Sequence, residues 1–210
     1  KKKYAVSVSR ALQHLRENSS KYMTIEALRN EYSPKYAAIL TNLLNNEHRG
    51  IHLLYSNFKT LEGIGIFRIA LEEHNYVQFK LQYDASTRQT NVRIPEGMSE
   101  DEFYSREWYV TYTGEDSPEE KETMRYACNG EWHLIPYDKV VGALREKARR
   151  LGKQTDINLH GDIIKLIMIS KAGAEGISLY NVRYVHIMEP YWHAVRVDQV
   201  IGRARRINSH

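Results

Sequence analysis

The sequence is poor in the features that mark secreted, membrane-spanning and cysteine-based zinc proteins. It has one cysteine, Cys128, in 210 residues, which excludes an intrachain disulfide and a cysteine-rich zinc site. No apolar run approaches the roughly 18 residues of a membrane-spanning helix, and the first residues lack the long apolar segment of a signal peptide. These absences favour an intracellular protein. Because no initiator Met is present, we expect the chain to belong to a longer or processed polypeptide.

The charge balance is also modest. The formal net charge is +4, with 42% hydrophobic and 27% charged residues, which is typical of a soluble globular domain. This composition permits a polyanionic partner without requiring one. Cys128 lies on the apolar side of a predicted helix and is expected to be a small core residue. The spacing of His160, His186 and His193 matches no metal-ligand pattern, so no metal site is expected.

Short apolar segments alternate with helical patterns, which predicts an α/β fold with a mainly parallel sheet. Residues 1–45 are expected to be a helical lead-in or a linker, residues 46–210 the main domain, and residues 77–107 an insertion that begins with a hairpin over 77–95. Strands are expected over residues 50–58, 108–114, 162–170 and 182–188, and helices over 60–76, 117–130, 137–150 and from about 194.

The helix over residues 117–130 has the clearest signals. Ser117 and Glu120 form the pattern of a capping box, Pro118 suits the first helical position, and Gly130 supplies the stop. The helix that follows ends in KARR (residues 147–150), a cationic last turn that the helix dipole favours.

Three segments should meet at the carboxyl ends of the strands, where ligands bind in such folds. They are residues 56–58, 170–179 and 189–193. The loop SKAGAEGISL (170–179) can offer backbone N–H groups, the Ser170 hydroxyl and the Lys171 ammonium to a phosphate. Its glycines can equally serve a tight connection between strand and helix. The loop alone therefore does not distinguish a phosphate-binding site from an ordinary connection.

The segment QVIGRARR (residues 199–206) is the most informative one. Arg203 and Arg206 share a helical face, while Val200 and Ala204 can turn toward a core. Taken alone, this pattern is equally consistent with a basic surface helix.

GAEGISL (173–179) and QVIGRARR together resemble motifs V and VI of superfamily 2 helicases and translocases, and LLYSNF (53–58) resembles motif IV. YTGEDSPEEKETMRYACNGE (112–131) resembles the segment between them. The resemblance covers roughly residues 33–210 and is greatest to helicases of large nucleocytoplasmic DNA viruses. It is more distant to chromatin-remodelling translocases, from whose W-N-P step the residues YWHA (191–194) depart.

The resemblance implies a RecA-like three-layer lobe, the C-terminal one of two, with an inserted hairpin and a helical lead-in. It implies that Arg203 and Arg206 are arginine fingers that reach the γ-phosphate of ATP. It also implies two sets of binding residues: for ATP, Gln199, Gly202, Glu175, Gly176 and Ser178; for the nucleic-acid backbone, Ser56, Asn57, Lys59, Ser170, Lys171 and Gly173.

The first-lobe motifs of the same family are missing. No G-x-x-x-x-G-K-[ST] loop occurs: Gly152-Lys153 has Lys147 at the position that requires glycine, and Gln154 follows it. Asp101-Glu102 follows no apolar strand and is interpreted as a helix start or an exposed loop. The chain alone is therefore expected to be inactive, with the ligands of Mg²⁺ on an N-terminal lobe of the same polypeptide.

The resulting hypothesis is the C-terminal lobe of a nucleic-acid-dependent ATPase that couples ATP hydrolysis to translocation or unwinding. Its partners would be the N-terminal lobe and DNA, with RNA as the other possibility. If the source is viral, the host cytoplasm, the viral factory, the virion or the nucleus are the expected locations. The alternatives are a non-catalytic nucleic-acid-binding or regulatory module that retains the fold, and a basic protein–protein adaptor.

Overall fold

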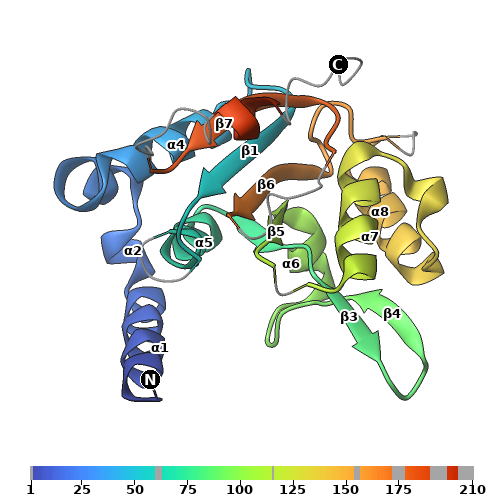
Figure 1. Ribbon diagram of the computed structural model, residues 1–210, viewed down its shortest axis with the longest axis horizontal. Helices are drawn as coiled ribbons and strands as arrows, with labels where there is room; N and C mark the ends of the chain where they lie inside the picture. The colour runs from blue at the N-terminus through green and yellow to red at the C-terminus, as the bar shows by residue number, and fades with distance from the viewer. Residues whose placement is uncertain are drawn as a thin grey trace.

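The computed structural model describes residues 2–59, 63–114, 116–153, 157–171, 178–189 and 198–202. Its centre is a five-stranded sheet in the order β2-β5-β6-β1-β7, in which all neighbouring strands are parallel (Figure 1). The strands are β1 (Ile51–Ser56), β2 (Tyr76–Gln78), β5 (Glu107–Tyr112), β6 (Ile164–Ser170) and β7 (Val182–Ile187). The predicted α/β class with a mainly parallel sheet is confirmed.

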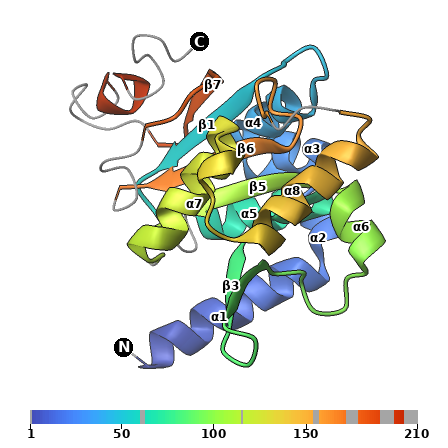
Figure 2. The same ribbon diagram turned by 90° about the vertical axis from the view of Figure 1, so that its right-hand side faces the viewer.

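Helices cover both faces of this sheet, which gives three layers (Figures 1 and 2). One face carries α4 (Pro34–Leu44) and α5 (Ile64–Glu73), and the other carries α6 (Glu100–Ser105), α7 (Pro118–Asn129) and α8 (Asp138–Arg150). Because both faces are covered, the central strands are buried: β1 at every position and β6 at all but one. No helix in the described part of the chain is long and apolar enough to cross a membrane.

The N-terminal residues form a helical segment that joins the core. Its elements are α1 (Lys2–Glu17), α2 (Ser19–Tyr22), α3 (Ile25–Ala27), a π-helical turn (Leu28–Tyr32) and α4. Met23, Leu28 and Tyr36 are buried in the same hydrophobic cluster as Phe67 of α5. Residues from Met23 onward therefore pack as part of the lobe, whereas α1 projects from it (Figure 1).

The hairpin prediction was wrong at its first strand. Val77 and Gln78 belong to β2, which pairs in parallel with β5 at the edge of the main sheet. The antiparallel hairpin comes later, as β3 (Leu81–Asp84) and β4 (Gln89–Val92). A three-residue strand whose partner lies about thirty positions away leaves little local signal to separate it from the hairpin that follows.

Helix capping follows the predicted chemistry. Ser117 caps α7, its hydroxyl accepting from the Glu120 N–H while the Glu120 carboxylate accepts from the Ser117 N–H, and Gly130 ends the helix at φ 76°. Ser99 caps α6, which places Asp101 in a first helical turn, as expected. Cys128 is fully buried, as predicted.

The last turn of α8 differs from its prediction at one residue. Lys147 does not extend into solvent: it is 1% exposed, and its ammonium donates to the carbonyls of Tyr104 at 2.8 Å and Arg106 at 2.7 Å. Arg149 and Arg150 remain at the surface and pair with Glu146. Tertiary hydrogen bonds to Lys147 therefore outweigh the helix-dipole term there.

A pair of histidines, His52 buried and His186 half-buried, joins β1 to β7. His52 Nδ1 lies 2.9 Å from His186 Nε2, their rings stack at 5.2 Å, and Tyr184 stacks on His52 at 4.4 Å. Burial, and then the neighbouring His186, lower the pKa of His52 to about 3. Burial, and then His48, lower the pKa of His186 to about 4. Both rings are therefore neutral at physiological pH, which lets one donate and the other accept.

Candidate functional site

The candidate site lies at the carboxyl edge of the sheet, where β6, β1 and β7 end side by side. Ser56 and Ser170, the last residues of β1 and β6, are register partners. On the other side of β1, the Met188 N–H donates to the Tyr55 carbonyl at 2.9 Å, which extends the β7 pairing to the strand end. The segments that resemble motifs IV and V therefore leave the sheet from adjacent strands, as predicted.

Glu189, after the end of β7, forms hydrogen bonds with the turn of residues 56–58, which we call the motif IV turn. Its carboxylate accepts from the Ser56 hydroxyl at 2.9 Å and from the Asn57 N–H at 2.8 Å. Sequence reasoning placed Glu189 on the rim but gave it no role, since its partners lie over 130 positions away in the chain. Its position directly after a strand, on the same rim as a polar turn, was the available signal.

Ser56 is the centre of this turn. Its hydroxyl oxygen accepts from the Phe58 N–H at 3.1 Å and also lies 3.0 Å from the Phe58 carbonyl. One hydroxyl hydrogen cannot serve the Phe58 carbonyl and Glu189 together, and the charged carboxylate is the stronger acceptor. Ser56 is fully buried, whereas Asn57 and Glu189 are half-buried.

Gly63 lets α5 begin directly against this turn. A Cβ at Gly63 would lie 2.2 Å from the Phe58 carbonyl oxygen and 2.3 Å from the Ser56 hydroxyl, distances that no side chain tolerates. The Ile64 N–H donates to the Phe58 carbonyl at 3.1 Å, and the Tyr36 hydroxyl donates to the Gly63 carbonyl at 3.3 Å. Burial, and then the charge of Glu189, raise the pKa of Tyr36 to about 12, so it remains a donor.

The two predicted serines face inward, and the neighbouring residues are accessible. Ser170 is 3% exposed, and its hydroxyl donates to the Tyr112 carbonyl at 3.4 Å. Lys59 and Lys171 are exposed, and Asn57 is half-buried with its side-chain oxygen accepting from Tyr55 at 2.9 Å. Ser56 and Ser170 thus shape the rim, while Asn57 and the two lysines present its polar surface.

Asn129, at the end of α7, holds the chain that follows the glycine-rich loop. Its amide nitrogen donates to the Ser178 carbonyl at 3.2 Å, and its amide oxygen accepts from the Tyr180 N–H at 2.9 Å. The second amide hydrogen reaches Glu131 at 3.1 Å, which also accepts from Arg125 at 3.1 Å. Ser178, one of the predicted ATP contacts, is therefore positioned through its backbone by Asn129, which was not among the predicted site residues.

The described start of the motif VI segment is helical over residues 198–202. Val200 is 3% exposed and joins the core, as predicted, while Gln199 and Gly202 are exposed. The remaining predicted site residues, Gly173, Glu175, Gly176, Arg203 and Arg206, lie outside the described residues, as do Tyr191, Trp192 and His193.

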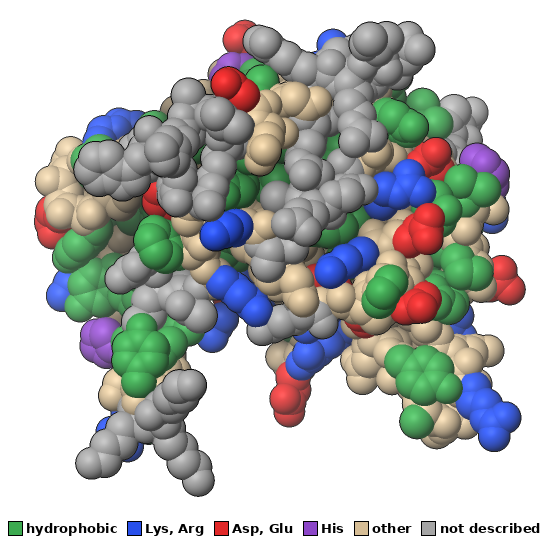
Figure 3. All heavy atoms as spheres, viewed as in Figure 1, with side chains coloured by type: hydrophobic (Ala, Val, Ile, Leu, Met, Phe, Trp, Pro, Cys, Tyr) green, Lys and Arg blue, Asp and Glu red, His purple; other side chains and the backbone are tan. Residues whose placement is uncertain are grey.

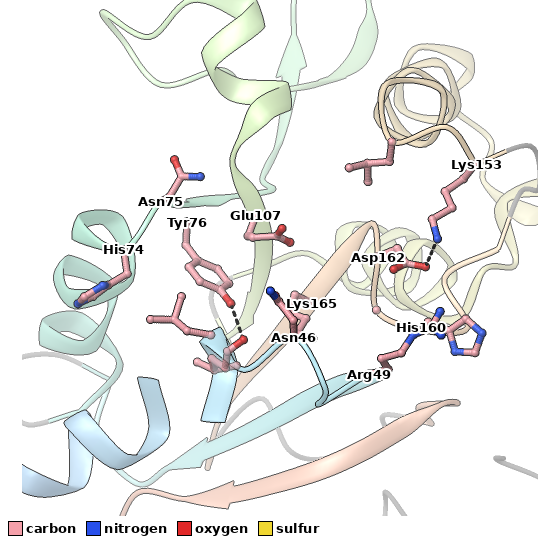
Figure 4. A pocket seen from close by; sticks show the side chains of 14 residues that line it. Asn46, Arg49, His74, Asn75, Tyr76, Glu107, Lys153, His160, Asp162 and Lys165 are labelled. Carbon is pink, nitrogen blue, oxygen red and sulfur yellow. Dashed lines mark hydrogen bonds and ion pairs between the residues drawn. The ribbon is translucent and has the colours of Figure 1, made fainter. Parts of the chain in front are cut away.

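A mixed-charge pocket of about 370 Å³ lies at the opposite, amino-terminal edge of the sheet (Figure 4). Two of its cations lie beside carboxylates. Lys153 pairs with Asp162 at 3.2 Å, and the charge of Glu107 partly offsets the lowering of the Lys165 pKa by burial. This charge balance and its distance from the motif segments separate it from the candidate site. Among the described residues, no group of three or more His, Cys, Asp and Glu could hold a metal ion.

Comparison with known proteins places these features in a family. The helicase conserved C-terminal domain matches residues 117–208. A termination factor NPH-I homolog of African swine fever virus is 31% identical over 189 residues, which cover 88% of this chain and 24% of that protein. A protein of Acanthamoeba polyphaga mimivirus, named as an ATP-dependent RNA helicase, is 29% identical over 188 residues, with 90% and 24% covered.

The chain thus spans about a quarter of the length of these relatives. No solved structure matches it. The matched domain, the three-layer parallel fold and the adjacent motif segments agree with one another. The chain is therefore a C-terminal RecA-like lobe of a superfamily 2 helicase, and it is similar to part of the African swine fever virus and mimivirus proteins.

Proposed function

We propose that the polypeptide containing this lobe is a nucleic-acid-dependent ATPase that couples ATP hydrolysis to translocation or unwinding. The observation that carries the proposal is the pairing of Ser56 with Ser170, which brings the segments resembling motifs IV and V together at one edge. Ligands of such folds bind at the carboxyl edge of the sheet, so loops that leave the same edge can contact both the nucleotide and the nucleic acid.

In this proposal, the accessible residues grip the nucleic-acid backbone. Asn57, Lys59 and Lys171 contact phosphates, and Gly173 would be a further contact, while the buried Ser56 and Ser170 position the strand ends. Such contacts read no bases, so binding should be largely independent of sequence and should weaken with salt. The 45% exposed ring of Phe58 next to them can stack on a base without reading it.

The nucleotide would be held from the same edge. Gln199 and Gly202 lie on the exposed side of a helical segment that Val200 anchors in the core, which suits contact with a ligand between two lobes. Ser178, Glu175 and Gly176 would line the same cleft. Arg203 and Arg206 would stabilise the negative charge of the transferring γ-phosphoryl group, a contribution worth roughly 10³ to 10⁵ in rate in related systems. Mg²⁺ would be held by the N-terminal lobe.

The test is ATP turnover by the complete polypeptide, with and without duplex DNA, single-stranded DNA and RNA. Arg203→Ala and Arg206→Ala should abolish stimulated turnover and leave nucleic-acid affinity nearly unchanged, whereas Arg205→Ala, in the same segment, should retain turnover. If the native polypeptide does not hydrolyse ATP, or is indifferent to Arg203 and Arg206, the lobe serves instead as a binding module.

A further inference from the structure

A basic groove runs along the outer edge of the sheet, away from β1, β6 and β7. We define it by seven charged residues that line a cavity of about 520 Å³: Arg16, Arg68, Glu72, Lys80, Arg93, Glu96 and Arg106. They come from α1, from α5, from the chain on either side of the β3–β4 hairpin and, for Arg106, from the end of α6. Residues Tyr76 to Gln78 of β2, the last strand on that side, form its floor.

The charge of the groove is unbalanced. Five cationic side chains face two carboxylates, an excess of three positive charges in one cavity, whereas the chain as a whole carries +4. Figure 3 shows Lys and Arg side chains gathered on the surface between α1 and the hairpin. Such an excess attracts a polyanion rather than a neutral or zwitterionic ligand.

Three of the cations are oriented by the protein. Arg16 pairs with Glu72 at 3.5 Å, and Arg68 donates to the Tyr109 hydroxyl at 3.2 Å. Arg106 donates to the Glu72 carbonyl at 3.2 Å and pairs with Glu102, which does not line the groove, at 2.7 Å. The buried Nε of Arg106 has no hydrogen-bond acceptor among the described residues. Together, these ion pairs and hydrogen bonds hold the three guanidinium groups in place along the groove.

The other two cations, Lys80 and Arg93, are exposed on the two chains that lead into and out of the hairpin. They are held side by side, because the Arg93 N–H donates to the Lys80 carbonyl at 2.8 Å. Among the described residues, no carboxylate lies within 4 Å of either side chain as an ion-pair partner. Lys80 acts on Asp116 only at longer range, where its charge opposes the rise of the Asp116 pKa caused by burial. Both side chains are thus available for a ligand that passes the hairpin base.

We propose that the basic groove binds the phosphodiester backbone of a nucleic acid, as a second contact surface distinct from the motif segments. An acidic peptide added to the sheet edge fits less well, since β2 offers only three residues for strand pairing. A single phosphate also fits less well, because the cations come from several elements along a groove. Nucleic-acid binding at the groove does not depend on whether the polypeptide hydrolyses ATP.

The experiment measures the affinity of the complete polypeptide for DNA and RNA oligonucleotides at several salt concentrations. Lys80→Glu and Arg93→Glu should each weaken binding about tenfold at low salt and lower the slope of log affinity against log salt by about 0.7 to 0.9. Lys139→Glu, at an exposed lysine of α8 outside the groove, makes the same change in charge and should have little effect.

Oligonucleotide length gives a second readout. Wild type should lose affinity when the strand becomes too short to reach both surfaces, whereas the groove variants should already be insensitive to this shortening. Turnover at saturating nucleic acid should stay near wild type, which separates this inference from the proposed ATPase function. If Lys80→Glu and Arg93→Glu shift affinity and slope no more than Lys139→Glu does, the groove is not a nucleic-acid surface, and an acidic protein becomes the better ligand.

Discussion

The Glu189 carboxylate accepts from the Ser56 hydroxyl at 2.9 Å and from the backbone N–H of the next residue at 2.8 Å. This contact joins the ends of β1 and β7, and it replaces water with a charged acceptor at a buried strand end. Hydrogen bonds to a charged group are about twice as strong as neutral ones, so the motif IV turn is held firmly before any ligand arrives.

Glu189→Ala should lower the free energy of unfolding by about 2 kcal/mol, because it leaves the Ser56 hydroxyl and the Asn57 N–H without their acceptor. Urea denaturation measures the change. Glu17→Ala, at an exposed carboxylate on α1, is the control and should have an effect near zero. Equal effects of both substitutions would mean that the two hydrogen bonds accepted by Glu189 add nothing to stability.

Gly63→Ala should be more damaging, because its methyl group would lie within 2.3 Å of two oxygens of the same turn. We expect a loss above about 2 kcal/mol through displaced backbone. Gly142→Ala is the matched control: it lies within α8 with no atom within 4 Å of the added Cβ, and should stabilise by about 0.5 to 1 kcal/mol. Thermal unfolding of both variants tests the opposite signs; a neutral Gly63→Ala would contradict the proposed close contact.

Asn129→Ala should reduce both stability and function, because it removes the amide that holds Ser178 and Tyr180. We expect about 2 kcal/mol of destabilisation, and lower nucleic-acid-stimulated turnover at temperatures where the variant is still folded. Asn46→Ala, at an exposed position, should change neither quantity. Full turnover in a destabilised Asn129→Ala variant would show that the amide stabilises the fold without positioning the loop.

Stability should fall as the pH drops from about 6.5 to 5. The pKa values of His52 and His186 are lowered in the folded protein to about 3 and about 4, so the unfolded chain takes up protons first. Each histidine should then cost about 1.4 kcal/mol per pH unit below its unfolded pKa near 6.5. Stability is therefore fully present above that pKa and is lost below it.

Urea titrations at several pH values measure this slope. His186→Gln should roughly halve it, while His133→Gln, at an exposed ring, should leave it unchanged. The window above pH 5 is informative because Asp84 and Glu146, whose pKa values are lowered to about 2, lose their contribution only at more acidic pH. An unchanged slope in His186→Gln would show that the pKa of His186 is not lowered in the folded protein.

Local interactions account for the features that the sequence predicts best. The capping box of Ser117 and Glu120 joins residues three apart, and the apolar runs of β1 and β6 need no knowledge of their partners to be identified as buried strands. The meeting of motifs IV and V also follows from strand order, since carboxyl ends of parallel strands share an edge.

Long-range contacts account for what was missed. Lys147 forms its hydrogen bonds with residues 41 and 43 positions away, and Ser56 meets Glu189 across 133 positions. Neither pair has a periodic or capping signature. The inward orientation of Ser56 and Ser170 also could not be read from residue type, because a serine at a strand end suits a phosphate contact and a buried hydrogen bond equally well.

Helix α5 links the motif IV turn to the basic groove. Its N-cap, Gly63, lies against the Ser56 turn, and its residues Arg68 and Glu72 line the basic groove. At about 1.5 Å per residue, this short, buried helix fixes the separation of the two surfaces. A nucleic-acid strand bound at both would therefore have to span a fixed distance on the lobe, set by the length of α5.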